Sequence, residues 1–142
     1  MESILLDTNV LSELMRPQPD QAVMGWFAGR TGAIFYISSI TQAEIMLGIS
    51  LLPTGKRRNA LTAAADAMFS LDFAGRCLPF DATGAANYAA IVSDRRRVGQ
   101  AISTEDAQIA AIALAHGYPL ATRNTKDFLN INGLTLYDPW QT

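Results

Sequence analysis

Histidine and cysteine are almost absent from this sequence, which contains one of each, His116 and Cys77, among 142 residues. A single cysteine cannot form an intramolecular disulfide, and the two residues together cannot complete a Cys/His zinc site. Catalysis by a pair of histidines is excluded for the same reason. We interpret Cys77 as a small core residue in a strand, and His116 as a cation in the last turn of a helix, where the helix dipole favours positive charge.

Long apolar runs, repeats and low-complexity segments are missing as well. No stretch approaches the roughly 20 apolar residues of a membrane-spanning helix, and no basic segment followed by an apolar one precedes the first predicted strand. Because 49% of the residues are hydrophobic and 17% are charged, the chain does not belong to the disordered class. We therefore expect one domain over residues 1–142, in a reducing cytoplasm and away from membranes.

The chain does contain an alternation of short apolar segments and helical patterns, which predicts a parallel sheet with helices on both faces. Strands are expected near Ser3 to Leu6, Ile34 to Ile37, Cys77 to Phe80, Pro119 to Ala121 and Leu134 to Tyr137. Helices are expected near Asn9 to Met15, Asp20 to Ala28, Ile40 to Leu52, Lys56 to Leu71, Ala82 to Val98 and Glu105 to His116. The predicted fold class is α/β, with three layers, α/β/α, around a mostly parallel sheet of about five strands. The Gly-x-Gly-x-x-Gly fingerprint of a dinucleotide-binding domain does not follow the first strand.

Residues that favour helix ends flank several of these segments. Ser39 and Gln42 have the spacing of a capping box, and Thr104 is the expected cap of the last helix. Gly117 is the expected stop of that helix. We assign three further acids to N-capping rather than to metal binding or catalysis: Asp20, Asp81 and Asp138.

Four other stretches place acidic or amide side chains where an apolar element begins or ends. Asp7 follows the apolar run 4–6, Glu44 lies on a strongly apolar helix, and Asp106 shares a helical stripe with inward-facing residues. Asn124 and Asp127 follow a short strand. Ligands of open α/β sheets bind at the carboxyl ends of the strands, so these residues are predicted to converge there. Carboxylates are natural ligands for Mg²⁺ or Mn²⁺, ions that activate water and neutralise charge in phosphodiester hydrolysis.

Each acid has a structural alternative. Asp7 can cap the helix after its strand, Asp106 can be a first-turn acid that interacts favourably with the helix dipole, and Asp127 can start a short helix. Glu44 fits such an explanation least well. If its helix is mostly buried, an unpaired carboxylate there costs several kcal/mol, and a metal is one partner that offsets this cost.

The ordered motifs resemble those of PIN-domain nucleases, specifically the VapC and FitB-like toxins of type II toxin–antitoxin pairs. The resemblance covers nearly the whole chain and rests on Leu5 to Asn9, Ile40 to Glu44, Asp106 to Ala111 and Ala121 to Phe128. Three further segments are typical of the FitB-like branch: Arg16-Pro17-Gln18-Pro19, Leu78-Pro79-Phe80-Asp81 and Asp138-Pro139-Trp140.

The resemblance implies a PIN-like fold and a Mg²⁺- or Mn²⁺-dependent endoribonuclease that a small antitoxin holds inactive. By motif, Asp7, Glu44 and Asp106 match the three core acids of the family, with Thr8, Asn9 and Thr122 as supporting residues. Asn124 stands where many members have an acid, and Asp127 follows three residues later, where members with Asn often have one. The resemblance also implies a homodimer with the antitoxin laid in a groove, and contact with operator DNA only through the antitoxin.

A net charge of −2 lacks the basic excess that phosphate binding usually requires. Several acids would be metal ligands, however, and a bound divalent ion reverses the local sign. The bases gather in two runs that are candidate RNA contacts: Lys56-Arg57-Arg58 and Arg95-Arg96-Arg97. The alternative for the second run is a solvated helix end.

Two other functional classes compete with the metal-dependent ribonuclease. One is a catalytically weak module that acts through complex formation with an antitoxin and its DNA operator, which the amide at Asn124 favours. The other is a phosphotransfer domain in which Asp7 accepts the phosphoryl group. Such a site needs a second acid in the first loop, and Thr8, Asn9 and Val10 do not supply one. For self-association, we expect Val23, Trp26 and Phe27, with the region Leu51 to Leu71, to carry surplus apolar surface.

Overall fold

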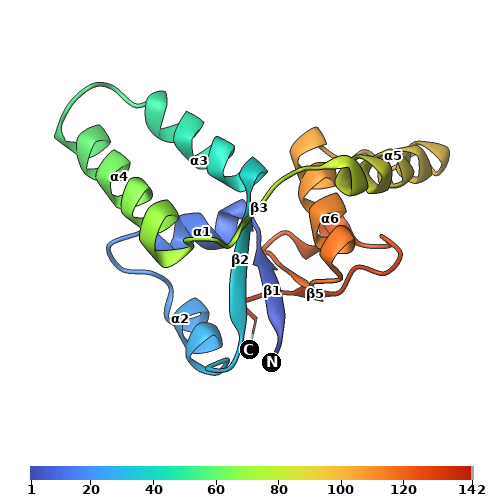
Figure 1. Ribbon diagram of the computed structural model, residues 1–142, viewed down its shortest axis with the longest axis horizontal. Helices are drawn as coiled ribbons and strands as arrows, with labels where there is room; N and C mark the ends of the chain where they lie inside the picture. The colour runs from blue at the N-terminus through green and yellow to red at the C-terminus, as the bar shows by residue number, and fades with distance from the viewer. Residues whose placement is uncertain (142) are drawn as a thin grey trace.

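A parallel sheet forms the centre of the molecule in the computed structural model, which describes residues 1–141 (Figure 1). Within this range the sheet has five strands in the order β3-β2-β1-β4-β5, and every neighbouring pair is parallel. The strands are β1 (Ser3–Leu6), β2 (Ile34–Ser38), β3 (Cys77–Leu78), β4 (Leu120–Ala121) and β5 (Leu136–Tyr137). The expected α/β fold is confirmed, and β1 lies at its centre.

Helices cover both faces of the sheet (Figure 1). They are α1 (Thr8–Leu14), α2 (Gln21–Ala28), α3 (Ser39–Ser50), α4 (Lys56–Ala67), α5 (Ala82–Arg97) and α6 (Thr104–His116). A π-helical turn, η1 (Met68–Asp72), extends α4, and a 3₁₀ turn, η2 (Thr125–Phe128), follows β4. No helix within residues 1–141 is long and apolar enough to span a membrane.

The central strand supplies both hydrophobic cores because successive side chains of a strand point to opposite faces. Leu5 is fully buried among residues of α5 and α6, whereas Ile4 and Leu6 are fully buried on the other face, with residues of α1 and α4. The apolar run therefore fixes β1 from both sides. This packing holds the carboxyl end of β1, where Asp7 follows, in one place.

Helix ends follow the expected chemistry with shifts of one residue. Ser38 rather than Ser39 caps α3, and Ser103 rather than Thr104 caps α6, since these side chains accept hydrogen bonds from Thr41 N–H and Asp106 N–H. Gly117 ends α6 with φ 68°. Asp20 and Asp81 are confirmed as N-caps, and Asp138 accepts from Trp140 N–H in a turn without a helix.

Three expectations about burial are wrong. Cys77 is exposed because β3 is an edge strand with a neighbour on one side only. Val23 is fully buried, so it adds no surface for association. Helix α3 buries only Thr41 and Ile45, although its sequence is apolar on most sides. Its exposed side chains include Met46, Leu47 and Leu51, with 52%, 60% and 75% of their surface accessible.

Candidate active site

Asp7 is the most buried acid of the site, with 4% of its surface exposed. It directly follows β1 and is the N-cap of α1, with Oδ1 accepting the Thr8 N–H at 2.8 Å. Its second oxygen, Oδ2, accepts the hydroxyl of Thr122 at 2.8 Å and the amide of Asn9 at 3.4 Å. The capping alternative is thus correct for one oxygen only. The other oxygen is held by residues from two different elements.

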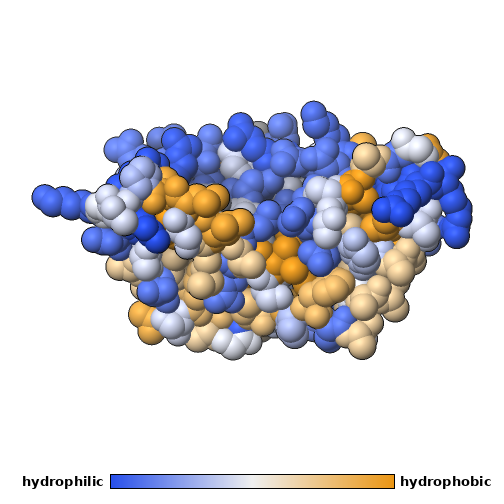
Figure 2. Space-filling model, turned by 90° about the horizontal axis from the view of Figure 1, so that it is seen from above, coloured by the Kyte–Doolittle hydropathy of each residue, from blue (hydrophilic) through white to orange (hydrophobic). Residues whose placement is uncertain are grey.

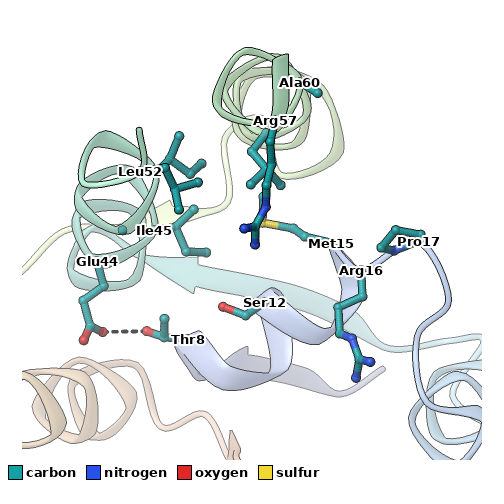
Figure 3. A pocket seen from close by; sticks show the side chains of 13 residues that line it. Thr8, Ser12, Met15, Arg16, Pro17, Glu44, Ile45, Leu52, Arg57 and Ala60 are labelled. Carbon is teal, nitrogen blue, oxygen red and sulfur yellow. Dashed lines mark hydrogen bonds between the residues drawn. The ribbon is translucent and has the colours of Figure 1, made fainter. Parts of the chain in front are cut away.

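Thr8 connects Asp7 with Glu44. Its hydroxyl donates to Oε1 of Glu44 at 2.6 Å, as the dashed line in Figure 3 shows. The hydroxyl of Thr41, one turn before Glu44 on α3, lies 2.8 Å from the Thr8 hydroxyl. Since the only hydroxyl proton of Thr8 is donated to the carboxylate, Thr41 is the donor in the hydrogen bond between the two threonines. Sequence reasoning missed Thr41, although it stands three residues before Glu44, on the same helical face.

Asn9 and Thr122 join the beginning of α1 to the end of β4. The amide nitrogen of Asn9 lies 3.3 Å from the Thr122 hydroxyl, and its oxygen accepts the Arg123 N–H at 3.2 Å. Thr122 is fully buried and also accepts the Asn124 N–H at 3.1 Å. Both residues therefore lie where the sequence predicted supporting residues, and they connect the Asp7 carboxylate to the loop that carries Asn124.

Burial raises the pKa of Asp7 to about 6, a shift that hydrogen bonds from Thr122 and Thr8 oppose and the charges of Asp106 and Glu44 reinforce. The pKa of Asp106 is raised too, first by burial and then by the charges of Asp127 and Glu44, against a hydrogen bond to Ser103. These like charges act on one another across β1, α3, α6 and η2. Bringing four acids within range of mutual repulsion is unfavourable without a cation.

Asn124 and Asp127 both belong to the η2 turn and are both exposed. Asn124 occupies the N-cap position without a side-chain capping bond. Asp127 lies in the turn itself, and of the two only Asp127 adds negative charge near Asp106. Asp127 thus lies in the first turn of a short helix, as its structural alternative predicts.

The donor set fits a hard divalent cation. The ion pairs within residues 1–141 are Arg16 with Glu13 and Arg97 with Asp94, so no basic side chain neutralises Asp7, Glu44, Asp106 or Asp127. No three His, Cys, Asp or Glu side chains in the described part of the chain converge closely enough to form a ready-made ion site. The charges of Glu44 and Asp106 act on Asp7, and those of Glu44 and Asp127 act on Asp106, without a preformed ligand cage among residues 1–141. An oxygen-rich site of this kind suits Mg²⁺, which keeps several waters and takes only part of its ligands from protein.

A groove extends from the site between α1, α3 and α4 (Figure 3). Its volume is about 530 Å³, and Thr8 and Glu44 lie at one end. Ile45 points into it from α3, Leu52 points into it from the bend that follows α3, and Arg57 extends toward it from α4 (Figure 3). The walls are mostly apolar, with a few polar groups close to the acids.

The two basic runs have different environments. Lys56 and Arg57 are exposed at the beginning of α4, and Arg58 is half-buried. Arg96 is exposed, and Arg97 forms an exposed pair with Asp94. Arg95, in contrast, is 7% exposed and donates to backbone carbonyls, so the expectation that it contacts RNA is wrong. The helical twist turns this one arginine of the run inward.

Sequence and structure comparisons agree on the family. A model of the PIN domain matches residues 4–134. The chain is 42% identical to Toxin FitB of Neisseria gonorrhoeae over 137 residues, covering 96% of this chain and 98% of FitB. It is 39% identical to the VapC ribonuclease Y4jK of Sinorhizobium fredii over 138 residues, covering 97% of this chain and 98% of that protein.

Solved structures of toxin–antitoxin complexes share the fold. The crystal structure of FitAcB from Neisseria gonorrhoeae matches with a TM-score of 0.87 at 42% identity, over 98% of this chain and 99% of that chain. The structure of FitAB bound to a DNA fragment gives the same TM-score and identity, over 98% and 96% of the two chains. The chain therefore belongs to the PIN-domain family, within the branch that contains the VapC and FitB toxins.

Proposed function

We propose that residues 1–142 form a single PIN nuclease domain that hydrolyses RNA phosphodiester bonds with Mg²⁺ or Mn²⁺, as the toxin of a cytoplasmic toxin–antitoxin pair. The observation that carries the proposal is the link from Asp7 through Thr8 to Glu44, which holds two acids of distant segments at the carboxyl end of β1 without a cationic partner. The substrate class is supported by relatives that are VapC ribonucleases, from Sinorhizobium fredii and Rickettsia felis.

Asp7, Glu44 and Asp106 would hold the metal, with Asp127 supplying a further charge. The bound ion would activate a water and neutralise negative charge on the phosphodiester. The chain contributes orientation: Thr122 and Asn9 fix one oxygen of Asp7, and Thr8 fixes one oxygen of Glu44. We also propose that RNA phosphates are contacted by the exposed Lys56, Arg57 and Arg96. Arg58 and Arg97, at the ends of the two basic runs, would add positive charge beside these contacts.

The test is cleavage of RNA by the purified chain with Mg²⁺ or Mn²⁺ and with excess chelator. Each of Asp7→Asn, Glu44→Gln and Asp106→Asn should lower the cleavage rate at least ~100-fold, because each removes a ligand charge. Asp66→Asn is the matched control, since Asp66 is an exposed acid on α4 outside the site. Undiminished cleavage in chelator, or equal loss in the Asp66 variant, would refute the proposal.

The proposed partner is an antitoxin that binds through the groove between α1, α3 and α4. A groove with apolar walls and the Glu44 carboxylate at one end suits an amphipathic peptide that brings a basic side chain to Glu44. Solved complexes of relatives contain toxin, antitoxin and DNA, and we propose that this chain meets DNA only through its antitoxin. Co-purification of the tagged chain with a small DNA-binding protein from cells that express both from the native locus tests this association.

We further propose a homodimer formed through the exposed apolar side of α3. Met46, Leu47 and Leu51 are exposed there, and Leu71 at the end of η1 adds a fourth large apolar side chain with 73% exposure. Figure 2, seen from above, shows apolar patches over the half that holds α3 and α4, separated by polar surface. Exposed apolar patches of this kind mark association surfaces in soluble proteins. Trp26 and Phe27 are packed against the core instead.

The alternative function is a catalytically weak module that acts mainly by complex formation with an antitoxin and its operator. The neutral amide of Asn124, which adds no negative charge to the site, favours this alternative. Metal-dependent cleavage that disappears with Asp7→Asn would exclude this alternative. Tight antitoxin binding by a chain that leaves RNA intact at millimolar Mn²⁺ would support it.

A further inference from the structure

Arg95 is a buried cation without an anionic partner. It lies in the last turn of α5 with 7% of its surface exposed, and it takes part in neither ion pair found within residues 1–141. Its Nη2 donates to the carbonyl of Asp127 at 3.0 Å and to that of Leu129 at 2.8 Å. Its Nη1 lies 3.5 Å from the carbonyl of Ala101. Every polar contact of the guanidinium is therefore with backbone oxygen.

The three carbonyls belong to two segments that carry acids of the site. Ala101 lies in the loop before α6, whose first turn contains Asp106. The other two carbonyls lie in and just after η2, the turn that contains Asp127 and packs on α6. Burial of an unpaired charge is costly, and the planar fork of arginine is suited to hold several acceptors in fixed geometry. A methionine or leucine would fill the same space without that cost.

We propose that Arg95 is a positioning residue that holds the η2 turn against the beginning of α6, so that Asp127 faces the same metal position as Asp106. This inference rests on the proposed metal-dependent function. The role differs from that of the neighbouring Arg96 and Arg97, which are exposed. Arg95 acts on the metal only through the backbone that carries Asp127.

Arg76 provides a matched control for a purely structural role. It is a partly buried arginine just before the edge strand β3, and it donates to the carbonyls of Phe35 and Asp72, which lie outside the segments that carry Asp106 and Asp127. Arg95→Met and Arg76→Met both remove a cation from backbone carbonyls. Both should lower the melting temperature. Only Arg95→Met should weaken the binding of Mn²⁺.

Two readouts on the RNA-free chain test the proposal. Calorimetric Mn²⁺ binding should weaken at least ~10-fold in Arg95→Met and stay within about twofold in Arg76→Met, because only the first releases a ligand-bearing turn. Hydrogen exchange of a peptide covering residues 123–130 should accelerate in Arg95→Met alone. If Arg95→Met does not fold, Arg95→Lys replaces it, since lysine keeps the charge but cannot span the carbonyls. Unchanged Mn²⁺ affinity or unchanged exchange in a folded Arg95 variant would overturn the proposal.

A double-mutant cycle identifies the route of action. If Arg95 acts through Asp127, the Mn²⁺ affinity of Asp127→Asn should fall no further when Arg95→Met is added. Independent, additive losses would overturn the proposal. An unmodified chain that binds Mn²⁺ but leaves RNA intact would refute the nuclease function alone, because the binding and exchange comparisons need no cleavage.

Discussion

The Thr8 hydroxyl donates to the Glu44 carboxylate at 2.6 Å, which ties the first turn of α1 to a residue of α3 that lies 36 positions later in the chain. The same residue donates its backbone N–H to Asp7. Thr8 therefore contacts both acids, Asp7 through its backbone N–H and Glu44 through its hydroxyl, and sets the spacing between them. A hydroxyl at this position is required for the geometry, whereas its methyl group is not.

Replacing Thr8 tests whether this spacing matters for cleavage. Thr8→Val keeps the shape and the backbone bond to Asp7 but loses the bond to Glu44. A hydrogen bond to a charged group contributes about 1.5–3 kcal/mol, so we expect at least a ~10-fold lower cleavage rate at subsaturating Mn²⁺. Thr8→Ser, which retains the hydroxyl, should stay close to the parent. Equal rates for the valine and serine variants would contradict the role of the hydroxyl.

The raised pKa of Asp7 predicts how stability depends on pH in metal-free protein. Its pKa is about 6 in the folded chain, against 3.8 for an ordinary aspartate. Between these values the folded state keeps a proton that the unfolded state has released. The stabilisation is therefore complete below about pH 4 and is lost as the pH rises through 6, by about 3 kcal/mol. Divalent metal should restore it at neutral pH by binding the ionised carboxylate.

Denaturant unfolding in chelator at pH 4.5 and pH 7.5 measures this loss. Other groups titrate over the same range, so the comparison is with Asp7→Asn, which has no proton to lose at this position. The free energy of unfolding of the parent should fall by more than that of the variant. Parallel pH dependence in the two chains would show that burial does not raise the pKa of Asp7.

Sequence patterns pointed to two acids of the candidate site, because Asp7 follows the central strand and Asp106 lies in the first turn of α6. The apolar run before Asp7 predicts a buried central strand, and parallel topology brings the other strand ends to the same edge. Other features depend on packing that no local pattern contains. Which arginine of the run 95–97 points inward is decided by the contact of α5 with α6 and η2. The apolar composition of α3 indicated burial, although only Thr41 and Ile45 of this helix are buried.

Gly48 offers a way to block the groove without changing a site residue. It lies on α3 and lines the groove, and a Cβ built there meets no atom within 4 Å. Gly48→Leu should therefore fold at least as well as the parent, because glycine is unfavourable inside a helix by about 1 kcal/mol. We expect antitoxin affinity to fall at least ~10-fold, since the leucine occupies space that an anchor side chain needs.

The control for this variant is Gly25→Leu, on α2, where a Cβ also meets nothing within 4 Å. Gly25 does not line the groove. Binding of the antitoxin that co-purifies with the unmodified chain can be measured by calorimetry for both variants. Equal affinity of the two would place the antitoxin elsewhere.

Charge on the exposed side of α3 should prevent self-association. Leu47→Glu combined with Leu51→Glu adds two charges to the proposed dimer surface, and burying unpaired charges in an interface is costly. Light scattering should give twice the 15.4 kDa chain mass for the parent and a single mass for the double variant. Met24→Glu, on the exposed side of α2, should remain dimeric. A parent that scatters as one chain at micromolar concentration would contradict the dimer.

Asn124 and Asp127 are the two candidates for the fourth position of the site. An amide oxygen can bind a metal but adds no charge, whereas Asp127 places a carboxylate in the field of Asp106. In a 3₁₀ turn, side chains three residues apart lie on the same face, so the two residues can share the site. We propose that they do, with Asp127 carrying the charge.

RNA cleavage across a Mn²⁺ titration separates the two contributions. Asp127→Asn should require more Mn²⁺ and cleave more slowly than Asn124→Ala, because it removes a negative charge that attracts the ion. If Asn124 alone completes the site, a second ion should bind weakly or arrive only with the RNA phosphate. Loss confined to Asn124→Ala, with Asp127→Asn equal to the parent, would overturn the assignment. Asp127 would then be a surface residue of the η2 turn, and the backbone contacts of Arg95 would serve the fold alone.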